Sequence, residues 1–423
     1  MDKLLVHGGS TLRGSVNISG SKNASLPIIA AALLTEDDCI IRRVPDVSDT
    51  NYMVQILNAL GADVERSSGT VRAKCADISD TAPYELVRRM RASICVMGPL
   101  LARKRRAVVS LPGGCVIGDR PVDIHLKGLQ ALGAKVEFEG GNIILSAPDG
   151  LKGATMDLRG ELGPTVLGTD NVMMAATLAE GITVIESAAA EPEVLDLANF
   201  LNSMGAKITG AGTSRIVIEG VEKLHGTEHT VIPDRIEAGT FMAAAALAGD
   251  GVTLRRICRD HMKAITAAIE ASGHVVECNA TGDTCTIRRG DNLRGCDLVT
   301  SPYPGYPTDM QAQMTALLAT TPGISVIKDT IFPQRFMHCA ELKRMGADIK
   351  VDNGTAIVRG VTKLSAAPVM ASDLRASAAL VLAALTASGT TEINRLYHID
   401  RGYEHIDEKL LMLGANVQRV KDR

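Results

Sequence analysis

The chain has 423 residues, of which 46% are apolar, and a formal net charge of −3. This apolar content is enough for a full core, while the charge balance provides no basic field for binding nucleic acid. Trp is absent, and there are only 5 Phe and 6 Tyr, which argues against base-stacking platforms and against the aromatic belts of membrane proteins.

The apolar stretches are about a dozen residues at most, too short to cross a bilayer, and the first residues do not resemble a signal peptide. The nine Cys lack CxxC spacing, which is typical of mostly free thiols in a reducing compartment. The nine His are scattered, so no metal site is expected. We therefore expect a cytoplasmic protein with no cofactor, no membrane partner and no nucleic-acid partner.

In chain order, six apolar runs each follow a charged or amide residue. The residues before these runs are Lys22-Asn23, Arg91, Asn171, Arg235, Asp309 and Arg375. Because the runs are apolar on nearly every side, they predict buried helices. The start of a helix has unpaired N–H groups, which attract anions. Six copies indicate one structural unit that is repeated along the chain.

A second marker gives the period of the repeat. A glycine follows an amphipathic helical pattern and precedes a β-type run at Gly61, Gly133, Gly205, Gly273, Gly346 and Gly414, with spacings of 72, 72, 68, 73 and 68 residues. Each glycine is predicted to end a helix. A unit of about 70 residues thus holds a buried helix, an outer helix and several short strands. Six such units account for the whole chain.

The last unit is cut short, and the N-terminus is expected to complete it. Residues 357–377 align without gaps on residues 5–25. We therefore expect two domains of three units each, residues 22–230 and residues 1–21 with 231–423. Two crossings between the domains predict a hinge that closes on a ligand.

Residues 110–125 differ chemically from the rest of the chain. Three glycines and two prolines predict a turn-rich, mobile loop. Cys115 in this loop has no apolar period around it, and nearby guanidinium groups or helix starts would favour its thiolate. We interpret Cys115 as reactive, and Cys39 and Cys95 as buried structural thiols.

Arg120 and Arg401 occupy equivalent positions, 13 residues before Gly133 and Gly414, and each follows an aspartate. One interpretation is a helix N-cap aspartate with a solvated arginine after it. The alternative is a cationic pocket that binds polyanionic substrates, because guanidinium groups suit phosphates and carboxylates. The pocket would be formed by Lys22, Arg91, Arg120, Arg335, Arg375 and Arg401.

Asp309 is the acidic residue among junctions that otherwise carry cations or an amide. Thr308 and Gln311 have capping-box spacing, so Asp309 is either a first-turn acid that favours the helix or a general base. Its position among cations favours the general base.

Several motifs resemble those of the UDP-N-acetylglucosamine 1-carboxyvinyltransferase family, the enolpyruvyl transferases of peptidoglycan synthesis. They include LeuProGlyGlyCys, SerGlySerLysAsnAla, ProThrAspMetGlnAlaGln, AspLeuArgAlaSer and HisIleAspArgGlyTyrGlu, and the resemblance spans the chain. It implies an α/β fold with two inverted, barrel-like domains, each of three βαβαββ-type repeats in pseudo-threefold arrangement. The implied reaction transfers enolpyruvyl from phosphoenolpyruvate to the 3-hydroxyl of UDP-N-acetylglucosamine through a tetrahedral ketal.

The resemblance also implies roles for individual residues. Cys115 would donate a proton, form an adduct with phosphoenolpyruvate and react with fosfomycin, while Asp309 would take the proton of the sugar hydroxyl. Lys22, Arg120 and Arg401 would hold phosphoenolpyruvate. The remaining residues would contact the sugar nucleotide or support the closed site, and they are Asn23, Arg91, Pro121, Val122, Asp123, Ile124, Thr165, Ile331, Arg335, Asp373 and Arg375.

One segment departs from the family pattern. Where many members read SerValGlyAlaThr beside the nucleotide phosphates, this chain has residues 163–169, and Gly163 replaces a basic residue. Arg159 is the candidate for the missing charge. Two other functions stay open, namely enolpyruvyl transfer to shikimate 3-phosphate and a non-catalytic regulatory paralogue. A paralogue of that kind would be expected to have lost Cys115, Lys22 or Asp309.

Overall fold

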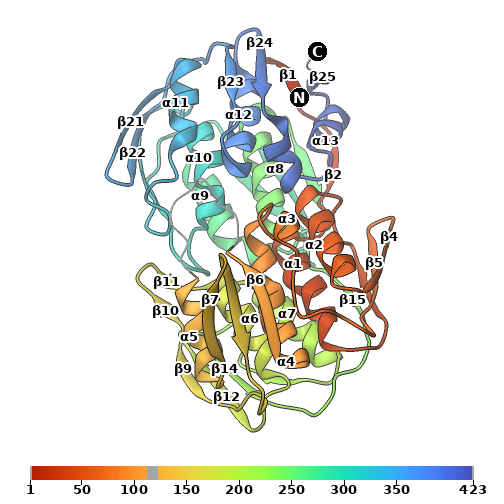
Figure 1. Ribbon diagram of the computed structural model, residues 1–423. Helices are drawn as coiled ribbons and strands as arrows, with labels where there is room; N and C mark the ends of the chain where they lie inside the picture. The colour runs from red at the N-terminus through yellow and green to blue at the C-terminus, as the bar shows by residue number, and fades with distance from the viewer. Residues whose placement is uncertain (1, 112–121, 422–423) are drawn as a thin grey trace. The chain divides into compact units, whose positions relative to one another are not determined.

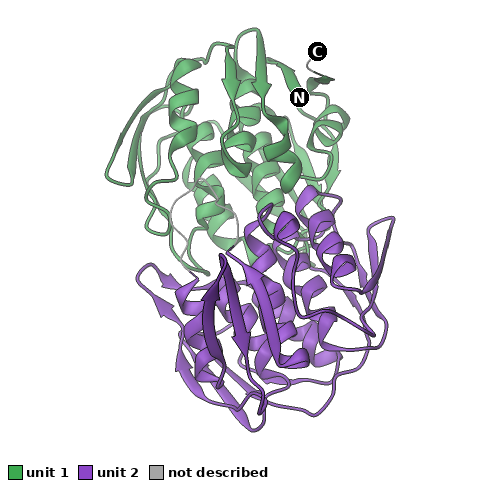
Figure 2. Cartoon of the chain, viewed as in Figure 1, with its two compact units in different colours: residues 1–19, 116–118, 233–423 green, residues 20–115, 119–232 purple. Residues whose placement is uncertain are grey.

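The computed structural model describes residues 2–111 and 122–421. Within these residues the chain forms two compact units (Figure 2). Unit 1 consists of residues 2–19 and 233–421, and unit 2 of residues 20–111 and 122–232. Each unit contains both helices and sheets around its own apolar core, which confirms the predicted α/β fold class.

Three inner helical segments form the core of unit 2. They are α1 (Lys22–Ala31) with the 3₁₀ turn η1 (Ala32–Leu34), the 3₁₀ turn η2 (Arg91–Val96) with α4 (Met97–Lys104), and α6 (Val166–Ala176). Most of their residues are buried, as the apolar runs predicted. The predicted start at Asn171 was wrong, because α6 begins five residues earlier. Thr165 caps it by accepting a hydrogen bond from the N–H of Gly168 at 3.2 Å.

Outer helices of unit 2 pack on the inner ones. α2 (Ser48–Ala59) and α7 (Pro192–Ser203) contact α1, α5 (Asp123–Ala131) contacts α6, and the short α3 (Tyr84–Val87) contacts η2. The described strands of unit 2 are β3 (Cys39–Arg42), β4 (Asp63–Ser67), β5 (Thr70–Lys74), β6 (Arg106–Ser110), β7 (Lys135–Glu139), β8 (Asn142–Ser146), β9 (Thr155–Asp157), β10 (Arg159–Gly160), β11 (Gly163–Pro164), β12 (Ile182–Glu186), β13 (Lys207–Thr209), β14 (Arg215–Glu219) and β15 (Glu228–Thr230). They form sheets in the orders β15-β3-β5-β4, β6-β8-β7, β13-β14-β12-β9 and β10-β11.

Unit 1 has the same plan. Its inner helices α8 (Arg235–Ala248), α10 (Gln311–Leu318) and α12 (Leu374–Thr386) contact one another, and the 3₁₀ turn η4 (Thr308–Met310) leads into α10. The outer helices are α9 (Lys263–Ala271), α11 (Met337–Arg344) and α13 (Ile406–Met412). The 3₁₀ turns η3 (Arg259–Met262) and η5 (Leu396–Arg401) precede α9 and α13.

The described strands of unit 1 form three four-stranded sheets. The strands are β1 (Asp2–His7), β2 (Ser15–Asn17), β16 (Val252–Arg255), β17 (Val275–Cys278), β18 (Thr284–Arg288), β19 (Leu298–Val299), β20 (Ile324–Lys328), β21 (Asp348–Asp352), β22 (Thr355–Arg359), β23 (Pro368–Met370), β24 (Thr390–Asn394) and β25 (Asn416–Lys421). Their orders are β23-β24-β1-β25, β17-β18-β16-β2 and β19-β20-β22-β21.

The sheet β19-β20-β22-β21 illustrates the repeated topology. β19 and β20 are parallel and α10 lies between them in the chain, while β21 follows α11 and forms an antiparallel hairpin with β22. β22 returns to pair with β20, so it lies inside the sheet. Its buried residues Ala356 and Val358 alternate with less buried ones, as expected of a strand with one face on the core.

The six marker glycines end their helices in the left-handed conformation. Their φ angles lie between 92° and 100°. A side chain disfavours this region, so glycine suits the residue that follows the last helical turn. The predicted helix ends are thus confirmed at Gly61, Gly133, Gly205, Gly273, Gly346 and Gly414.

The N-terminal strand β1 lies between the last two strands of the chain, β24 and β25 (Figure 1). It is antiparallel to both, with Leu4 opposite Ile393 on one side and Arg419 on the other. Leu4 and Val6 are fully buried. The two ends of the chain are therefore neighbours in one sheet of unit 1.

The chain passes from one unit to the other at residues 19–20 and again at residues 232–233. The two passing segments are hydrogen-bonded. The N–H of Asp234 donates to the carbonyl of Ser19 at 3.0 Å, and the N–H of Ser21 donates to the carbonyl of Ile232 at 2.7 Å. The described residues of unit 2, 20–111 and 122–232, therefore lie in the chain between the two described parts of unit 1.

The described cysteines include one disulfide, which the sequence did not predict. Cys278 and Cys285 are paired residues on β17 and β18, and their sulfurs are bonded. Six other described cysteines are free, and among them Cys39 and Cys95 are fully buried, as predicted.

Candidate active site

Asp309, in η4, is bound by two arginines. Its Oδ1 accepts a hydrogen bond from Arg335 Nη1 at 2.7 Å, and its Oδ2 accepts one from Arg375 Nη2 at 2.9 Å. The side chain of Asp309 is 26% exposed, whereas those of Arg335 and Arg375 are 6% and 2% exposed. Three predicted site residues therefore meet in unit 1, and the carboxylate is their most accessible group.

Local structure fixes Arg375 in this cluster. Asp373 caps α12, since its carboxylate accepts hydrogen bonds from the N–H groups of Arg375 at 2.8 Å and Ala376 at 3.1 Å. The Arg375 guanidinium lies 5.3 Å from the centre of the Tyr403 ring. Burial opposes the charge of Arg375, but Asp309 and Tyr403 outweigh burial and raise the pKa of the guanidinium. Arg375 is therefore a fixed positive charge beside Asp309.

The expected capping box at Thr308 does not form. The Thr308 hydroxyl donates a hydrogen bond to Asp329 Oδ2 at 2.7 Å. Pro307, the residue before η4, makes no capping hydrogen bond through its side chain. Asp329 also accepts hydrogen bonds at Oδ1 from the N–H groups of Ile331 at 3.0 Å and Phe332 at 2.8 Å. This buried carboxylate, which the sequence analysis missed, positions the residue before Asp309 and the predicted sugar contact Ile331. In the structure Asp329 directly follows β20, and no motif in the sequence marked it.

Arg401 ends η5 and is partly buried. The pKa of His398 is lowered, first by burial and then by the charge of Arg401, while the charge of Asp373 acts in the opposite direction. Arg401 and Asp373 therefore both act on the His398 imidazole. The expectation that Asp400 caps the outer helix was wrong, because α13 begins only at Ile406. Asp400 instead accepts hydrogen bonds from Arg419 at 2.8 Å and 3.0 Å.

In unit 2, Lys22 and Asn23 are the first two residues of α1, and both are partly buried. Ser21 caps this helix by accepting a hydrogen bond from the N–H of Ala24 at 3.3 Å. Lys22 Nζ lies 3.5 Å from Asp49 Oδ2, in the first turn of α2. Asp49 was missed from sequence because nothing along the chain links it to Lys22.

Arg91 lies near enough to α5 for its charge to act on a buried histidine of that helix. Val122 precedes α5. Of the first two residues of α5, Asp123 is exposed and Ile124 is partly buried. The next residue, His125, is buried, and burial followed by the charge of Arg91 lowers its pKa to about 3. His125 Nδ1 lies 3.0 Å from Asn171 Nδ2, so α5 is anchored to α6 at the predicted nucleotide-binding segment.

The β10-β11 hairpin leads directly into the cap of α6. Arg159 is paired with Pro164, one residue before Thr165. The candidate replacement cation therefore lies on the same hairpin as the predicted phosphate-contacting segment. Cys115, Arg120 and Pro121 lie outside the described residues, and their roles stay predictions.

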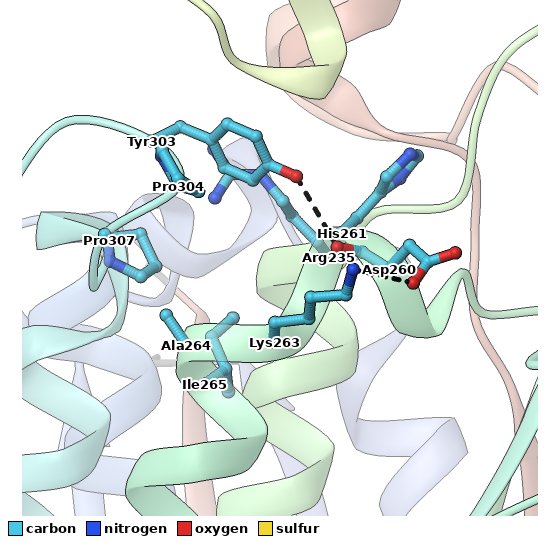
Figure 3. Close-up of a pocket in the computed structure, with 10 residues that line it drawn as sticks. Arg235, Asp260, His261, Lys263, Ala264, Ile265, Tyr303, Pro304 and Pro307 are labelled. Carbon is cyan, nitrogen blue, oxygen red and sulfur yellow. Dashed lines mark hydrogen bonds and ion pairs between the residues drawn. The ribbon is translucent and has the colours of Figure 1, made fainter.

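A small cavity in unit 1 is lined by residues of α8, η3, α9 and the segment before η4 (Figure 3). Lys263 pairs with the Asp260 carboxylate at 3.1 Å, and the Arg235 guanidinium lies 5.5 Å from the centre of the Tyr303 ring. The cavity volume is about 20 Å³, room for about one water molecule. This cavity is therefore too small to hold a sugar nucleotide.

Two features are absent from the part of the chain that the structure describes. No helix there is long and apolar enough to cross a membrane. No three or more His, Cys, Asp and Glu residues gather there in a group that suits a metal ion.

Comparison with known proteins places the chain in a family. Residues 6–410 match the family model of EPSP synthase (3-phosphoshikimate 1-carboxyvinyltransferase). The chain belongs to this enolpyruvyl transferase family. Within the family it is 72% identical to the UDP-N-acetylglucosamine 1-carboxyvinyltransferase of Akkermansia muciniphila, with 100% of this chain and 99% of that protein covered. The protein of the same name from Methylacidiphilum infernorum is 55% identical, with 99% of each chain covered.

Solved structures of the family show the same fold. The enolpyruvyl transferase NikO from Streptomyces tendae has a TM-score of 0.89 and 26% identity, with 100% of this chain and 99% of that chain covered. An EPSP synthase from Acinetobacter baumannii has a TM-score of 0.75 and 18% identity over 100% of both chains, a likeness of fold alone.

Proposed function

We propose that this protein transfers the enolpyruvyl group of phosphoenolpyruvate to the 3-hydroxyl of UDP-N-acetylglucosamine and releases phosphate, the first committed step of peptidoglycan synthesis. The observation that carries the proposal is the 72% identity over the whole chain to a protein named for this reaction. The family match alone would also fit transfer to shikimate 3-phosphate. We place the reaction in the cytoplasm and propose fosfomycin as an inhibitor.

In the proposed addition step, Asp309 takes the proton of the sugar hydroxyl while the hydroxyl oxygen forms a bond to C2 of phosphoenolpyruvate. Cys115 donates a proton to C3, which completes the tetrahedral ketal. In the elimination step, C3 loses a proton and the bond from C2 to the phosphate oxygen breaks. The products are the enolpyruvyl ether and inorganic phosphate.

The cations supply positioning and charge stabilisation in this scheme. Lys22, Arg120 and Arg401 hold the phosphate and carboxylate of phosphoenolpyruvate. Arg335 and Arg375 hold the Asp309 carboxylate, and Asp373 fixes the helix start that carries Arg375. No cofactor or metal takes part.

The sugar nucleotide is proposed to lie against the start of α5 and the cap of α6. The stretch from Arg120 to Ile124, with Pro121, Val122 and Asp123, receives the uridine. Thr165 and the unpaired N–H groups at the start of α6 face the diphosphate, because a helix N-terminus favours anions. Asn23, Arg91 and Ile331 contact the sugar.

A phosphate-release assay with phosphoenolpyruvate and each of two acceptors tests the proposal. We expect release with UDP-N-acetylglucosamine to be at least about 100-fold faster than with shikimate 3-phosphate, since a polar pocket discriminates strongly between acceptors. Faster release with shikimate 3-phosphate would assign the other reaction. No release with either acceptor would favour a regulatory paralogue.

A further inference from the structure

Two buried and two partly buried polar residues of unit 1 form a network to which the proposed chemistry gives no role. Lys409 Nζ donates hydrogen bonds to Glu237 Oε1 and, at 2.6 Å, to the hydroxyl oxygen of Ser19. The Ser19 hydroxyl donates to Glu404 Oε2 at 2.5 Å, and the Ser19 N–H donates to Glu237 Oε2 at 2.8 Å. Each of the four residues is thus bonded to at least one other through charged or polar atoms.

The burial of this network makes its geometry strict. Lys409 and Glu237 are 8% and 3% exposed. Ionised groups at that depth require partners in well-defined positions, whereas an apolar pair of similar size often gives equal stability. We therefore explain the network by the way it fixes the positions of the segments it joins, and not by a gain in stability.

The arrangement concerns three segments that are distant in sequence. Ser19 is the last residue of unit 1 before the first passage into unit 2, and its carbonyl accepts the N–H of Asp234. Glu237 lies in the first turn of α8, directly after the second passage. Glu404 lies two residues before α13, the outer helix that follows Arg401, and Lys409 lies within α13. Lys409 thus joins both passing segments to the segment that carries Arg401.

The Arg401 segment is also held from its other side. The Tyr403 hydroxyl lies 2.9 Å from Thr240 Oγ1 and 3.1 Å from Gln313 Nε2, on the inner helices α8 and α10. Consecutive residues, Tyr403 and Glu404, are therefore fixed to different parts of unit 1. This leaves the backbone two residues earlier, at Arg401, little freedom.

We propose that Lys409 is a positioning residue for phosphoenolpyruvate binding. Through Ser19 it fixes the segment that leads to Lys22, three residues later, and through Glu404 it fixes the segment that carries Arg401, three residues earlier. The inference rests on the proposed function, in which both cations hold phosphoenolpyruvate. Lys409 itself does not contact phosphoenolpyruvate in this proposal, yet it affects the binding of phosphoenolpyruvate and not that of the sugar nucleotide.

The first test is steady-state kinetics of Lys409→Met. We expect the KM for phosphoenolpyruvate to rise about tenfold or more, with the KM for UDP-N-acetylglucosamine changed by less than about twofold. The matched control is Lys207→Met, which removes an exposed lysine paired with Glu219 in unit 2 and should leave both KM values unchanged. A folded Lys409→Met protein with an unchanged KM for phosphoenolpyruvate, or with both KM values raised equally, would overturn the proposal.

Ser19→Ala keeps the Lys409–Glu237 pair and removes the hydroxyl that links it to Glu404, so it tests the same idea if Lys409→Met does not fold. We expect a smaller rise in the same KM, and an unchanged KM would count against the network. Turnover of the wild type, measured first, tests the proposed function separately. If the wild type shows none, calorimetric binding of phosphoenolpyruvate to these proteins replaces KM, and equal affinities would refute the positioning role.

Discussion

Asp309 uses both carboxylate oxygens to bind arginine. These charge-assisted hydrogen bonds hold the carboxylate in one orientation. Its partial exposure leaves room for a substrate hydroxyl to replace one arginine contact. We therefore expect substrate binding to change the hydrogen bonds of Asp309 to Arg335 and Arg375.

Asp309→Asn tests the general base. We expect turnover to fall by roughly 10² to 10⁴, the usual size of general acid–base catalysis, with the fold retained. Steady-state rates and circular dichroism are the measurements. Asp348→Asn, at an exposed residue paired with Arg359 at 3.8 Å, is the control and should turn over normally. Near-normal turnover of a folded Asp309→Asn protein would exclude the base.

His125 makes the stability of the fold sensitive to acid. The pKa of His125 is about 3 in the folded protein and about 6.5 in the unfolded chain. Between these two pH values the imidazole therefore binds a proton in the unfolded chain but stays neutral in the folded protein. Stability from neutral His125 is complete above the unfolded value and is lost as the pH falls toward the folded value.

Acidification from about pH 7 to about pH 4 should thus reduce the free energy of unfolding of the wild type more than that of His125→Gln, by up to about 1 kcal/mol per pH unit. Denaturant titrations at several pH values measure the difference. His405→Asn, at an imidazole that is 53% exposed, is the control and should behave as the wild type does. Parallel curves for wild type and His125→Gln would contradict this account.

At the scale of elements, α4 and α6 approach so closely that one position between them excludes a side chain. A Cβ added to Gly98 would lie 2.3 Å from the carbonyl oxygen of Asn171. The Gly98 N–H donates to Asn171 Oδ1 at 2.9 Å, and Asn171 Nδ2 donates to the carbonyl of Ile94 at 3.0 Å. Asn171 therefore joins the start of α4 to α6 as well as to α5.

Gly98→Ala should force these helices apart and destabilise unit 2 by about 1–3 kcal/mol, the usual cost of overpacking. Denaturant unfolding is the measurement. The matched control is Gly160→Ala, where the nearest atom to an added Cβ lies at 3.5 Å and little change is expected. Equal stabilities of the two variants would show that α4 and α6 can separate without penalty.

Much of each element could be predicted because its signal is local. Apolar runs predicted the inner helices, and a glycine after an amphipathic pattern predicted each helix end. The errors arose where tertiary contacts decide. Asn171 looked like a helix start but lies inside α6, where it bonds other elements, and the Thr308 hydroxyl binds Asp329 instead of capping its own helix.

The candidate site was predictable in part for the same reason. Asp309, Arg335 and Arg375 carry charges that suit the proposed chemistry, and motifs marked them. Their mutual contacts join residues 26 and 66 positions apart, so spacing alone gave no geometry. Asp49 and Asp329 were missed because they act on site residues and carry no motif of their own.

At the scale of the whole molecule, we propose that the two compact units are the two three-repeat domains predicted from the sequence. Because Asp2 is paired with Lys421 across β1 and β25, a short glycine-rich linker can join the two ends. A circular permutant opened at the exposed turn of residues 148–149 should fold and turn over like the wild type. Circular dichroism and turnover are the measurements.

The control for the circular permutant is a protein that lacks β1. Deletion of residues 1–8 takes β1 from between its two neighbours, so unit 1 should lose its folded state while unit 2 keeps its described sheets complete. Hydrogen exchange resolved by peptide is the measurement. Protection of residues 390–421 in the truncated protein would contradict the central place of β1.

The position of β1 has a consequence for the newborn chain on the ribosome. Its neighbours, residues 390–394 and 416–421, are made last, so at ordinary elongation rates β1 waits roughly 20–80 s for them. Unit 2 has all its described strands once residue 232 has been synthesised. During the wait Leu4 and Val6 are apolar residues of an unpaired strand, which readily pairs with other chains. The first strand to leave the ribosome is thus among the last to find its place, and chaperones have that interval in which to protect it.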